Sequence, residues 1–391
     1  MRIAIFSDNF YPELSGISDS VRLLADELAK LGHEINFYVP KYSAKNYRAI
    51  NLPVKELALD SRININRLFS LAAPFAGLQA RLVLPLFSPS LFKGFKPDII
   101  HSQLFFGAGL EAMIKAGSKK IPLLGTNHTA ISEFIKIKSK YLKKISVNYA
   151  TWYYNQCAFT TAPSQSVFKE MKEFGFNRPY KVISNPVDTN IFCPSADGLA
   201  VKEKFGLSSN TIVYAGRLAS EKNIEVVIRA VALAKKKVKD INLAIAGTGK
   251  FEPELRRLVK ELNLDRAVKF LGTLSQPDLA RLYQAAEVFS IASTSDTQSL
   301  TLMQAMACGL PAVVVDARAL PEYVNEHNGY VVKVGDYEAM AEKFILLLEN
   351  QELRQKLSQG AHNFVQQFSA PNIAKEWEKL YKGVIKDYKK I

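Results

Sequence analysis

Cysteine is scarce in this sequence, and long apolar runs are missing. Only three of the 391 residues are cysteines, no metal-binding spacing joins them, and one must stay unpaired. A disulfide framework is therefore not indicated, and a reducing, cytoplasmic setting is expected. No stretch of about 18 uninterrupted apolar residues occurs, so the sequence predicts no membrane-spanning helix.

Three other signals are absent. Residues 1–10 lack the apolar core of a signal peptide and are interpreted as the start of a first β-strand. No G-x-G-x-x-G motif is present, which argues against a dinucleotide-dependent dehydrogenase. Arginine clusters with an aromatic platform are missing as well, which argues against nucleic-acid binding despite the formal charge of +14. That charge leaves a phosphorylated ligand or an acidic lipid surface as the expected anionic partner.

The remaining composition is that of a globular protein, with 48% apolar and 23% charged residues. Short apolar segments alternate with helical periodicity in both halves, which predicts an α/β fold with parallel sheets. The predicted strands of the first half are 2–6, 34–39, 98–100 and 122–126. Those of the second half are 211–216, 242–247, 268–272, 288–292, 311–315 and 330–334.

The length suits two domains rather than one. A segment rich in Pro, Asn, Asp and Gly separates the two halves and is interpreted as the linker. A final amphipathic helix, with Trp377, Leu380 and Val384 on one side, is interpreted as a packing helix that crosses back to the first domain. The predicted parts are a first domain at 1–184, a linker at 185–198, a second domain at 199–368 and a C-terminal helix at 369–391.

The turn GRLASEKN (216–223) follows the first predicted strand of the second domain. Ligands of such folds bind at the carboxyl ends of the strands. Arg217 and Lys222 could hold a diphosphate there, Arg through its planar fork and Lys as a point charge. The alternative is a solvated pair of cations on a loop.

The segment STSDTQSLTLMQAMACGLPAV (293–313) joins a predicted strand to a predicted helix. Asp296 could accept hydrogen bonds from sugar hydroxyls, and Gln304, eight residues later, could bind the hydroxyls of a ribose. Free backbone N–H groups of residues 298–300 favour an anion at the start of this helix. The alternative is that Asp296 only caps a core helix.

Taken together, these motifs resemble the retaining, nucleotide-sugar-dependent glycosyltransferases of family 4, which have the GT-B fold. The resemblance rests on GRLASEKN, AGTGK (246–250) and AMACGLP (305–311) in the second half. In the first half it rests on NFYPELSG (9–16), HSQ (101–103), TNHT (126–129) and NPVD (185–188), all in the family's order. It implies two Rossmann-like domains that face an interdomain cleft, and a hexosyltransferase that needs no metal and no cofactor beyond its nucleotide-sugar co-substrate.

The resemblance also assigns roles to single residues. Gly16 would approach the donor diphosphate, and Arg217 and Lys222 would stabilise that diphosphate as it leaves. Gly247 and Gly249 would lie near the nucleotide base. The donor phosphate itself would help to deprotonate the acceptor hydroxyl in a front-face displacement.

Further donor contacts follow from the same match. His128 would lie beside the donor sugar and, with Asp296, is a predicted catalytic residue, while an involvement of His101 stays open. The predicted donor-binding residues around the helix start are Thr297, Gln298, Ser299, Leu300 and Gln304.

Asp296 and Gln304 also mark a departure, because the family usually has glutamates at both positions. Compared with glutamate, Asp296 keeps the negative charge on a shorter side chain, whereas Gln304 keeps the ability to form hydrogen bonds but has no charge. A non-catalytic nucleotide-sugar-binding partner is therefore an alternative to an active enzyme.

Two segments of the first domain interrupt the α/β pattern, the apolar stretch 67–97 and the basic amphipathic stretch 131–154. Together they favour an anionic lipid surface and a membrane lipid acceptor, as in the glycolipid-forming family members, namely diacylglycerol glucosyltransferases and phosphatidylinositol mannosyltransferases. The protein is then expected at the inner face of the cell membrane. The alternatives are that 67–97 is core and the lysines a solvated face, or that the acceptor is a soluble sugar. The predicted membrane-facing residues are Phe134, Lys136, Ile137, Lys140, Lys143 and Lys144.

Overall fold

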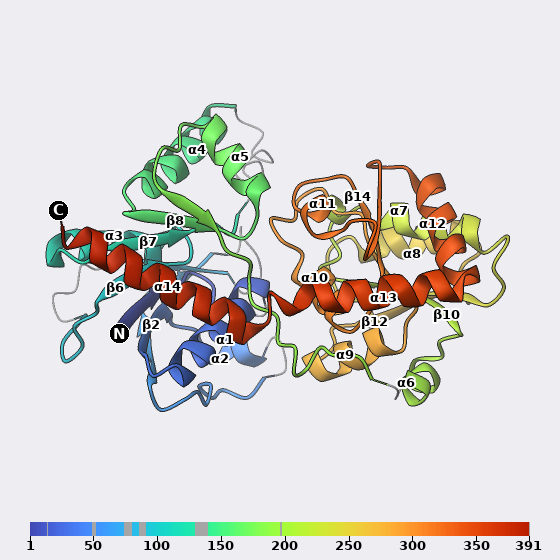
Figure 1. The fold of residues 1–391 in the computed structure, drawn as a ribbon, viewed down its shortest axis with the longest axis horizontal. Helices are drawn as coiled ribbons and strands as arrows, with labels where there is room; N and C mark the ends of the chain where they lie inside the picture. Colours follow the sequence, from blue (N-terminus) through green and yellow to red (C-terminus); the bar gives the residue numbers. More distant parts are fainter. Residues whose placement is uncertain are drawn as a thin grey trace. The chain divides into compact units, whose positions relative to one another are not determined.

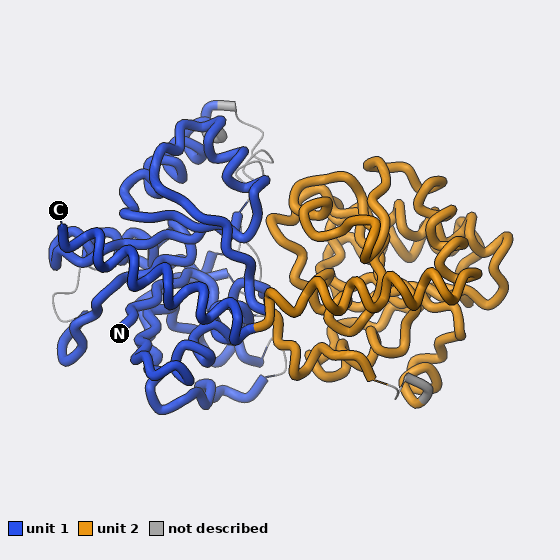
Figure 2. Tube along the Cα trace, in the orientation of Figure 1, with its two compact units in different colours: residues 1–186, 370–391 blue, residues 187–369 orange. Residues whose placement is uncertain are grey.

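The computed structural model describes residues 1–13, 15–48, 52–73, 80–85, 91–129, 140–195 and 198–390. The chain forms two compact units (Figure 2). Unit 1 comprises Met1–Pro186 and Ala370–Ile391, and unit 2 comprises Val187–Ser369. Within the described part of the chain, no helix is both long enough and apolar enough to cross a membrane.

Unit 1 is built on a seven-stranded sheet in the order β3-β2-β1-β6-β7-β8-β9, in which all neighbours are parallel. Its strands are β1 (Arg2–Phe6), β2 (Glu34–Pro40), β3 (Ile63–Leu68), β6 (Ile99–Ser102), β7 (Leu123–Thr126), β8 (Phe159–Ala162) and β9 (Tyr180–Val182). A separate antiparallel pair joins β4 (Ser70–Ala72) to β5 (Arg81–Val83). The helices of unit 1 are α1 (Gly16–Lys30), α2 (Ala44–Arg48), α3 (Gly107–Lys119), α4 (Lys140–Asn155), α5 (Gln165–Glu173) and α14 (Ala370–Tyr388).

Unit 2 holds a six-stranded parallel sheet in the order β12-β11-β10-β13-β14-β15. Its strands are β10 (Asn210–Ala215), β11 (Ile241–Ala246), β12 (Val268–Gly272), β13 (Val288–Ile291), β14 (Ala312–Val315) and β15 (Gly329–Val332). The helices of unit 2 are α6 (Gly198–Phe205), the 3₁₀ helix η2 (Ser220–Lys222), α7 (Ile224–Ala234), α8 (Glu252–Glu261), α9 (Gln276–Gln284), α10 (Leu300–Ala307), α11 (Leu320–Tyr323), α12 (Tyr337–Glu349) and α13 (Gln351–Gln366).

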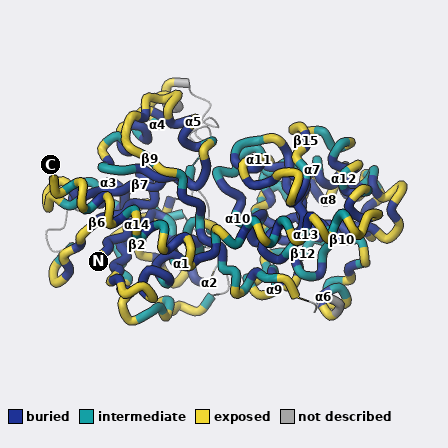
Figure 3. Tube along the Cα trace, viewed as in Figure 1, coloured by how far each residue is buried: buried dark blue, intermediate teal, exposed yellow. Residues whose placement is uncertain are grey.

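The two parallel sheets confirm the predicted α/β class (Figure 1). The central strands of both sheets are almost fully buried, as the dark-blue segments of Figure 3 show, because helices cover both faces of a parallel sheet. The edge strands β3, β9 and β12 are only partly buried. In each unit the strand order reverses beside the first strand, at β1/β6 and at β10/β13. Loops that follow these strands therefore lie at a topological switch point, where α/β sheets bind ligands.

The C-terminal helix α14 packs against α1 within unit 1. Trp377 and Val384 are buried, and Leu380 is half-buried. The segment interpreted as a linker is, in its first part, packed into unit 2. Val187 and Phe192 belong to the core of that unit, and each is 1% exposed.

Candidate functional site

The loops after β10 and β11 pack closely against each other at the carboxyl edge of the unit 2 sheet. The Leu218 N–H donates to the carbonyl of Thr248 at 3.0 Å. A Cβ on Gly247 would lie 1.9 Å from the carbonyl oxygen of Gly216, and one on Gly249 would lie 2.0 Å from that of Leu218. Both glycines are therefore required for this backbone packing, whatever ligand lies beside them.

Lys222 ends the 3₁₀ helix that follows β10, and its ammonium group is paired. Its Nζ lies 2.9 Å from Oδ1 of Asp296 and 3.5 Å from the hydroxyl of Ser293, so η2 is tied to the loop after β13. Both charged side chains are 14% exposed. The second carboxylate oxygen of Asp296 is buried and has no hydrogen-bond partner among the described residues.

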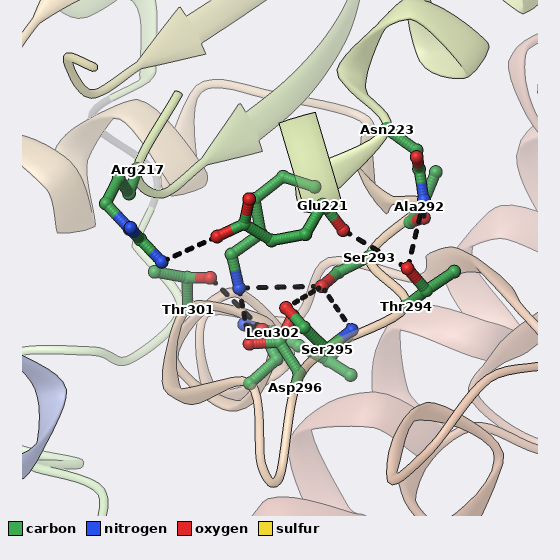
Figure 4. A network of polar contacts seen from close by, with 12 residues as sticks. Arg217, Glu221, Asn223, Ala292, Ser293, Thr294, Ser295, Asp296, Thr301 and Leu302 are labelled. Carbon is green, nitrogen blue, oxygen red and sulfur yellow. Dashed lines mark hydrogen bonds and ion pairs between the residues drawn. The ribbon is translucent and has the colours of Figure 1, made fainter. Parts of the chain in front are cut away.

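Arg217 has a different environment. Its guanidinium group donates to Oε1 of Glu221 at 2.8 Å, and its side chain is 66% exposed (Figure 4). Sequence reasoning identified both cations but not Glu221. Arg217 precedes the 3₁₀ helix that contains Glu221, so no helical spacing in the sequence indicated this pair.

Asn223 is a second residue that the sequence analysis missed. Its amide group donates to the carbonyl of Ala292 at 3.1 Å, and its backbone has a φ of +46°, a left-handed conformation that asparagine tolerates better than most residues. The Thr294 N–H also donates to the carbonyl of Glu221 at 3.2 Å. These bonds hold the loop with Asp296 against the loop with Lys222 (Figure 4).

Helix α10 begins at Leu300, and Ser299 is its N-cap. The Ser299 hydroxyl accepts a hydrogen bond from the Leu302 N–H at 3.3 Å. Asp296 therefore does not cap this helix, and that alternative is wrong. Gln298, Ser299 and Gln304 are buried, and Thr297 and Leu300 are half-buried.

In unit 1, His101 lies in the last half of β6, and His128 follows the carboxyl end of the neighbouring strand β7. Burial lowers the pKa of His101 to about 3 and that of His128 to about 4, so both imidazoles are neutral at pH 7. His128 Nε2 lies 2.8 Å from Oε1 of Gln103. A role of His128 beside a sugar would therefore be that of a neutral ring.

His101 is fully buried and held by α14. Its Nδ1 lies 2.7 Å from the Tyr381 hydroxyl, its Nε2 lies 2.7 Å from the Thr126 hydroxyl, and its ring packs on Trp377. These contacts occupy both ring nitrogens. They give His101 a structural role, which the sequence analysis had left open.

Asp8 is a buried acid that the sequence analysis did not single out. It follows β1, and its Oδ1 accepts a hydrogen bond from the Ala108 N–H at the start of α3 at 2.8 Å. Burial raises the pKa of Asp8 to about 6, and its Oδ2 has no partner among the described residues. Gly16, the predicted diphosphate contact of this domain, is exposed at the first position of α1.

The predicted membrane-facing surface is described only in part. Phe134, Lys136 and Ile137 lie outside the described residues, as do the side chains of Lys140 and Lys143. Lys144 is exposed on α4.

Six apolar side chains of unit 1 are exposed on α4 and around the β4–β5 pair. On α4 the exposed fractions are 74% for Tyr141, 47% for Ile145 and 46% for Trp152. Around the β4–β5 pair they are 52% for Phe69, 49% for Leu71 and 38% for Leu82. Both groups fall in the two segments that the sequence analysis associated with lipid.

Comparison with known proteins gives two family matches that together span most of the chain. Residues 14–191 match the family described as Glycosyltransferase Family 4. Residues 199–364 match the family described as Glycosyl transferases group 1. The break between the two matches falls within the segment 185–198.

Two curated relatives are similar over most of their length. The α-monoglucosyldiacylglycerol synthase of Acholeplasma laidlawii is 26% identical over 409 residues, which cover 100% of this chain and 99% of the relative. The GDP-mannose-dependent α-mannosyltransferase of Corynebacterium glutamicum is 26% identical over 346 residues, 86% of this chain and 78% of the relative.

Solved structures share the fold at lower identity. The Anabaena protein HepE in complex with UDP has a TM-score of 0.79 and 19% identity, covering 98% of this chain and 100% of that one. Sucrose-phosphate synthase from Thermosynechococcus elongatus has a TM-score of 0.80 and 19% identity, covering 99% of each chain. The expected GT-B fold is confirmed, and the chain belongs to glycosyltransferase family 4, the retaining enzymes that transfer a sugar from a nucleotide-sugar.

Proposed function

We propose that this enzyme transfers a hexose from a donor of the UDP-glucose or GDP-mannose type to a membrane lipid such as diacylglycerol or a phospholipid. The observation that carries the acceptor class is the exposure of six apolar side chains on α4 and around the β4–β5 pair. The name of the Acholeplasma relative supports the same acceptor class, since that protein makes a glucosyldiacylglycerol. The name of the Corynebacterium relative supports only the donor type, since that protein uses GDP-mannose.

Leaving-group stabilisation is the proposed task of Lys222 and Arg217. When the bond between the anomeric carbon and the diphosphate oxygen breaks, negative charge develops on the departing nucleoside diphosphate. A fixed cation stabilises that charge without reorganising during the reaction. Lys222 is held in place by Asp296 and Ser293, whereas Arg217 is largely exposed. Lys222 is therefore expected to contribute more.

Asp296 would bind the donor sugar through its unpartnered oxygen. A buried carboxylate oxygen without a hydrogen bond is destabilised by about 1–3 kcal/mol. A sugar hydroxyl that donates to Oδ2 of Asp296 would remove this cost. Because the oxygen is buried, the loop 293–299 must shift for the hydroxyl to reach it.

An apolar surface beside basic residues suits the face of an anionic membrane. Apolar side chains enter the boundary between headgroups and acyl chains, and each nearby lysine adds roughly 1 kcal/mol of attraction. Tyr141, Ile145 and Trp152 lie on one side of α4, and Lys144 lies beside them on the same helix. This surface would bring the active site to a lipid that does not leave the membrane.

The direct test follows radiolabelled hexose from UDP-glucose or GDP-mannose into lipid. The purified enzyme is incubated with vesicles that contain diacylglycerol and an anionic phospholipid, and the lipids are extracted. We expect labelled glycolipid with one of the two donors. Label that appears only on soluble sugars or glycans would overturn the lipid acceptor and leave the donor chemistry intact.

Surface variants test the membrane contact separately. Leu71→Ser with Leu82→Ser should lower both vesicle co-sedimentation and lipid glycosylation. The matched control is Val334→Ser with Leu346→Ser in unit 2, where the side chains are 52% and 37% exposed. Equal losses in both double variants would contradict a specific surface.

A non-catalytic partner is the second candidate, favoured by Asp296 and Gln304 where the family usually has glutamates. The variant that combines Asp296→Glu with Gln304→Glu tests it. If the natural sequence binds nucleotide-sugar without turnover and the double variant gains turnover, the chain is a binding partner. Turnover by the natural sequence excludes that candidate.

A further inference from the structure

A groove separate from the donor site lies in unit 1, at the amino ends of its strands. It has a volume of about 840 Å³, which is within the range of small-molecule pockets. Its lining includes Ile121 and Leu123 at the start of β7 and Phe159 at the start of β8. His128 follows the opposite, carboxyl end of β7, so the groove is not part of the predicted catalytic edge.

The walls of the groove are two helices with mostly apolar side chains. The last turns of α3 contribute Met113 and Ala116, and the second half of α14 contributes Leu380 and Val384. The lining positions on α14 recur with helical spacing, so they form one face of that helix. Such walls suit a hydrocarbon chain better than a sugar.

Two helical glycines keep the groove open. A Cβ on Gly117 of α3 or on Gly383 of α14 would meet no heavy atom within 4 Å. Glycine destabilises a helix relative to alanine, and no close backbone approach requires it at either position. Gly383 lies in the middle of the lining face of α14, so a larger side chain there would enter the groove.

The groove also carries positive charge. Arg178 donates from its Nε to the carbonyl of Asn155 at 2.6 Å, which fixes the guanidinium group. Lys379 lines the groove, and neither it nor Arg178 has an acidic partner in the described part of the chain. Lys181 and Asp387 line it too, but each is already paired with a side chain outside the lining.

We propose that this groove binds a single-chain anionic amphiphile. The alkyl chain lies between α3 and α14, and the anionic headgroup lies against Arg178 and Lys379. Arginine binds carboxylate and phosphate oxygens through two parallel N–H groups, and lysine adds a point charge. The site is independent of the proposed donor and acceptor chemistry, since every lining residue is in unit 1 and away from the carboxyl edge of its sheet.

The test titrates dansyl-labelled undecanoic acid into the full-length enzyme, below the micelle concentration and without vesicles. We expect a saturable fluorescence increase with one probe bound per chain. Oleate should displace the probe at a lower concentration than oleyl alcohol, because only the acid pairs with the cations. Equal displacement by the two would contradict the headgroup assignment and overturn the proposal.

Substitutions in the groove test whether the probe binds there. Gly383→Leu should abolish binding by filling the groove, while Gly383→Ala, which adds one methyl group, should keep it and confirm that the helix tolerates the change. Lys379→Glu should weaken binding by about fivefold, and Lys236→Glu, at an exposed lysine of unit 2, should not. Unchanged probe binding in Gly383→Leu would overturn the proposal.

Light scattering distinguishes an amphiphile in the groove from a second copy of the chain. If Gly383→Leu converts a dimer of the natural chain into a monomer, the groove holds a second copy and the proposal is wrong. A chain that keeps its oligomeric state while losing the probe supports the amphiphile.

Discussion

The proposed chemistry of unit 2 depends on two cations, whose ion pairs differ. Lys222 is nearly buried and held by two partners, whereas Arg217 projects from the surface with one. A cation that is already positioned loses little entropy on binding an anion. Lys222 is therefore expected to contribute more to leaving-group stabilisation than Arg217, although the two residues look equivalent in the sequence.

Replacing Lys222 by alanine should lower kcat by about 10²–10³-fold, because a fixed charge beside the leaving group is lost. Arg217→Ala should have a smaller effect. Turnover of nucleotide-sugar under saturating donor measures both. Lys235→Ala, at an exposed lysine of unit 2, is the control. An unchanged kcat in Lys222→Ala would remove this residue from the mechanism.

Asp8 should make unit 1 less stable at neutral pH than in mild acid. Burial raises its pKa from 3.8 to about 6, so the folded state binds the proton more tightly than the unfolded state. The contribution of Asp8 to the free energy of unfolding is largest below pH 3.8, decreases as the pH rises, and is lost above about pH 6.

Asp8→Asn removes the unfavourable burial of an ionised carboxylate and keeps an oxygen that accepts from the Ala108 N–H. At pH 8 the variant should be more stable by up to about 3 kcal/mol, and the gain should vanish near pH 4. Urea unfolding at the two pH values measures it, with Asp265→Asn in unit 2 as the control. A gain of equal size at both pH values would refute the assignment.

Among the elements, α14 has the clearest structural task. It follows unit 2 in the sequence yet belongs to unit 1, where it buries Trp377 and Tyr381 against His101. The Tyr381 hydroxyl contacts His101 inside the fold, away from water. Such a bond is costly to break, since the imidazole nitrogen then has one partner fewer.

Tyr381→Phe should destabilise unit 1 by about 1–3 kcal/mol. Chemical denaturation followed by a probe in unit 1 measures the change. Tyr388→Phe on the same helix, where the side chain is half-buried, should cost far less. Equal stability of the two variants would mean that the buried contact with His101 adds nothing.

Most strand positions of unit 2 could be predicted from the sequence, because buried parallel strands are short apolar runs. β10, β11 and β12 in unit 2 lie within one residue of their predicted ranges. Three strands of the seven-stranded sheet of unit 1 were missed for identifiable reasons. β3 reads ININRL, in which asparagines interrupt the apolar run, while β8 (FTTA) and β9 (YKV) are short and rich in polar residues.

Of the candidate site, Arg217, Lys222 and Asp296 could be singled out from the sequence, but their hydrogen-bond and ion-pair partners could not. The motif GRLASEKN identified Arg217 and Lys222. That Asp296 is the partner of Lys222 depends on β10 and β13 being neighbours in the sheet, which joins residues 74 apart. Local sequence patterns carry no information on such a contact. The same holds for His101, whose partner Tyr381 is 280 residues away.

At the level of the whole molecule, the chain combines two doubly wound units with separate cores. Unit 2 carries the cations and the loop 292–299, and unit 1 carries the exposed apolar side chains of α4 and the β4–β5 pair. This division predicts that nucleotide binding stabilises unit 2 directly. At a ligand concentration of 100 times Kd the gain is about 2.7 kcal/mol.

Hydrogen exchange of the full-length enzyme, with and without UDP or GDP, tests the central claim most directly. The claim is that the departing nucleoside diphosphate lies against Lys222 and the loops beside it. One of the two nucleotides should slow exchange in residues 216–223, 246–250 and 293–304, and Lys222→Ala should reduce this protection. Protection confined to other segments, or equal protection in Lys222→Ala, would contradict the account.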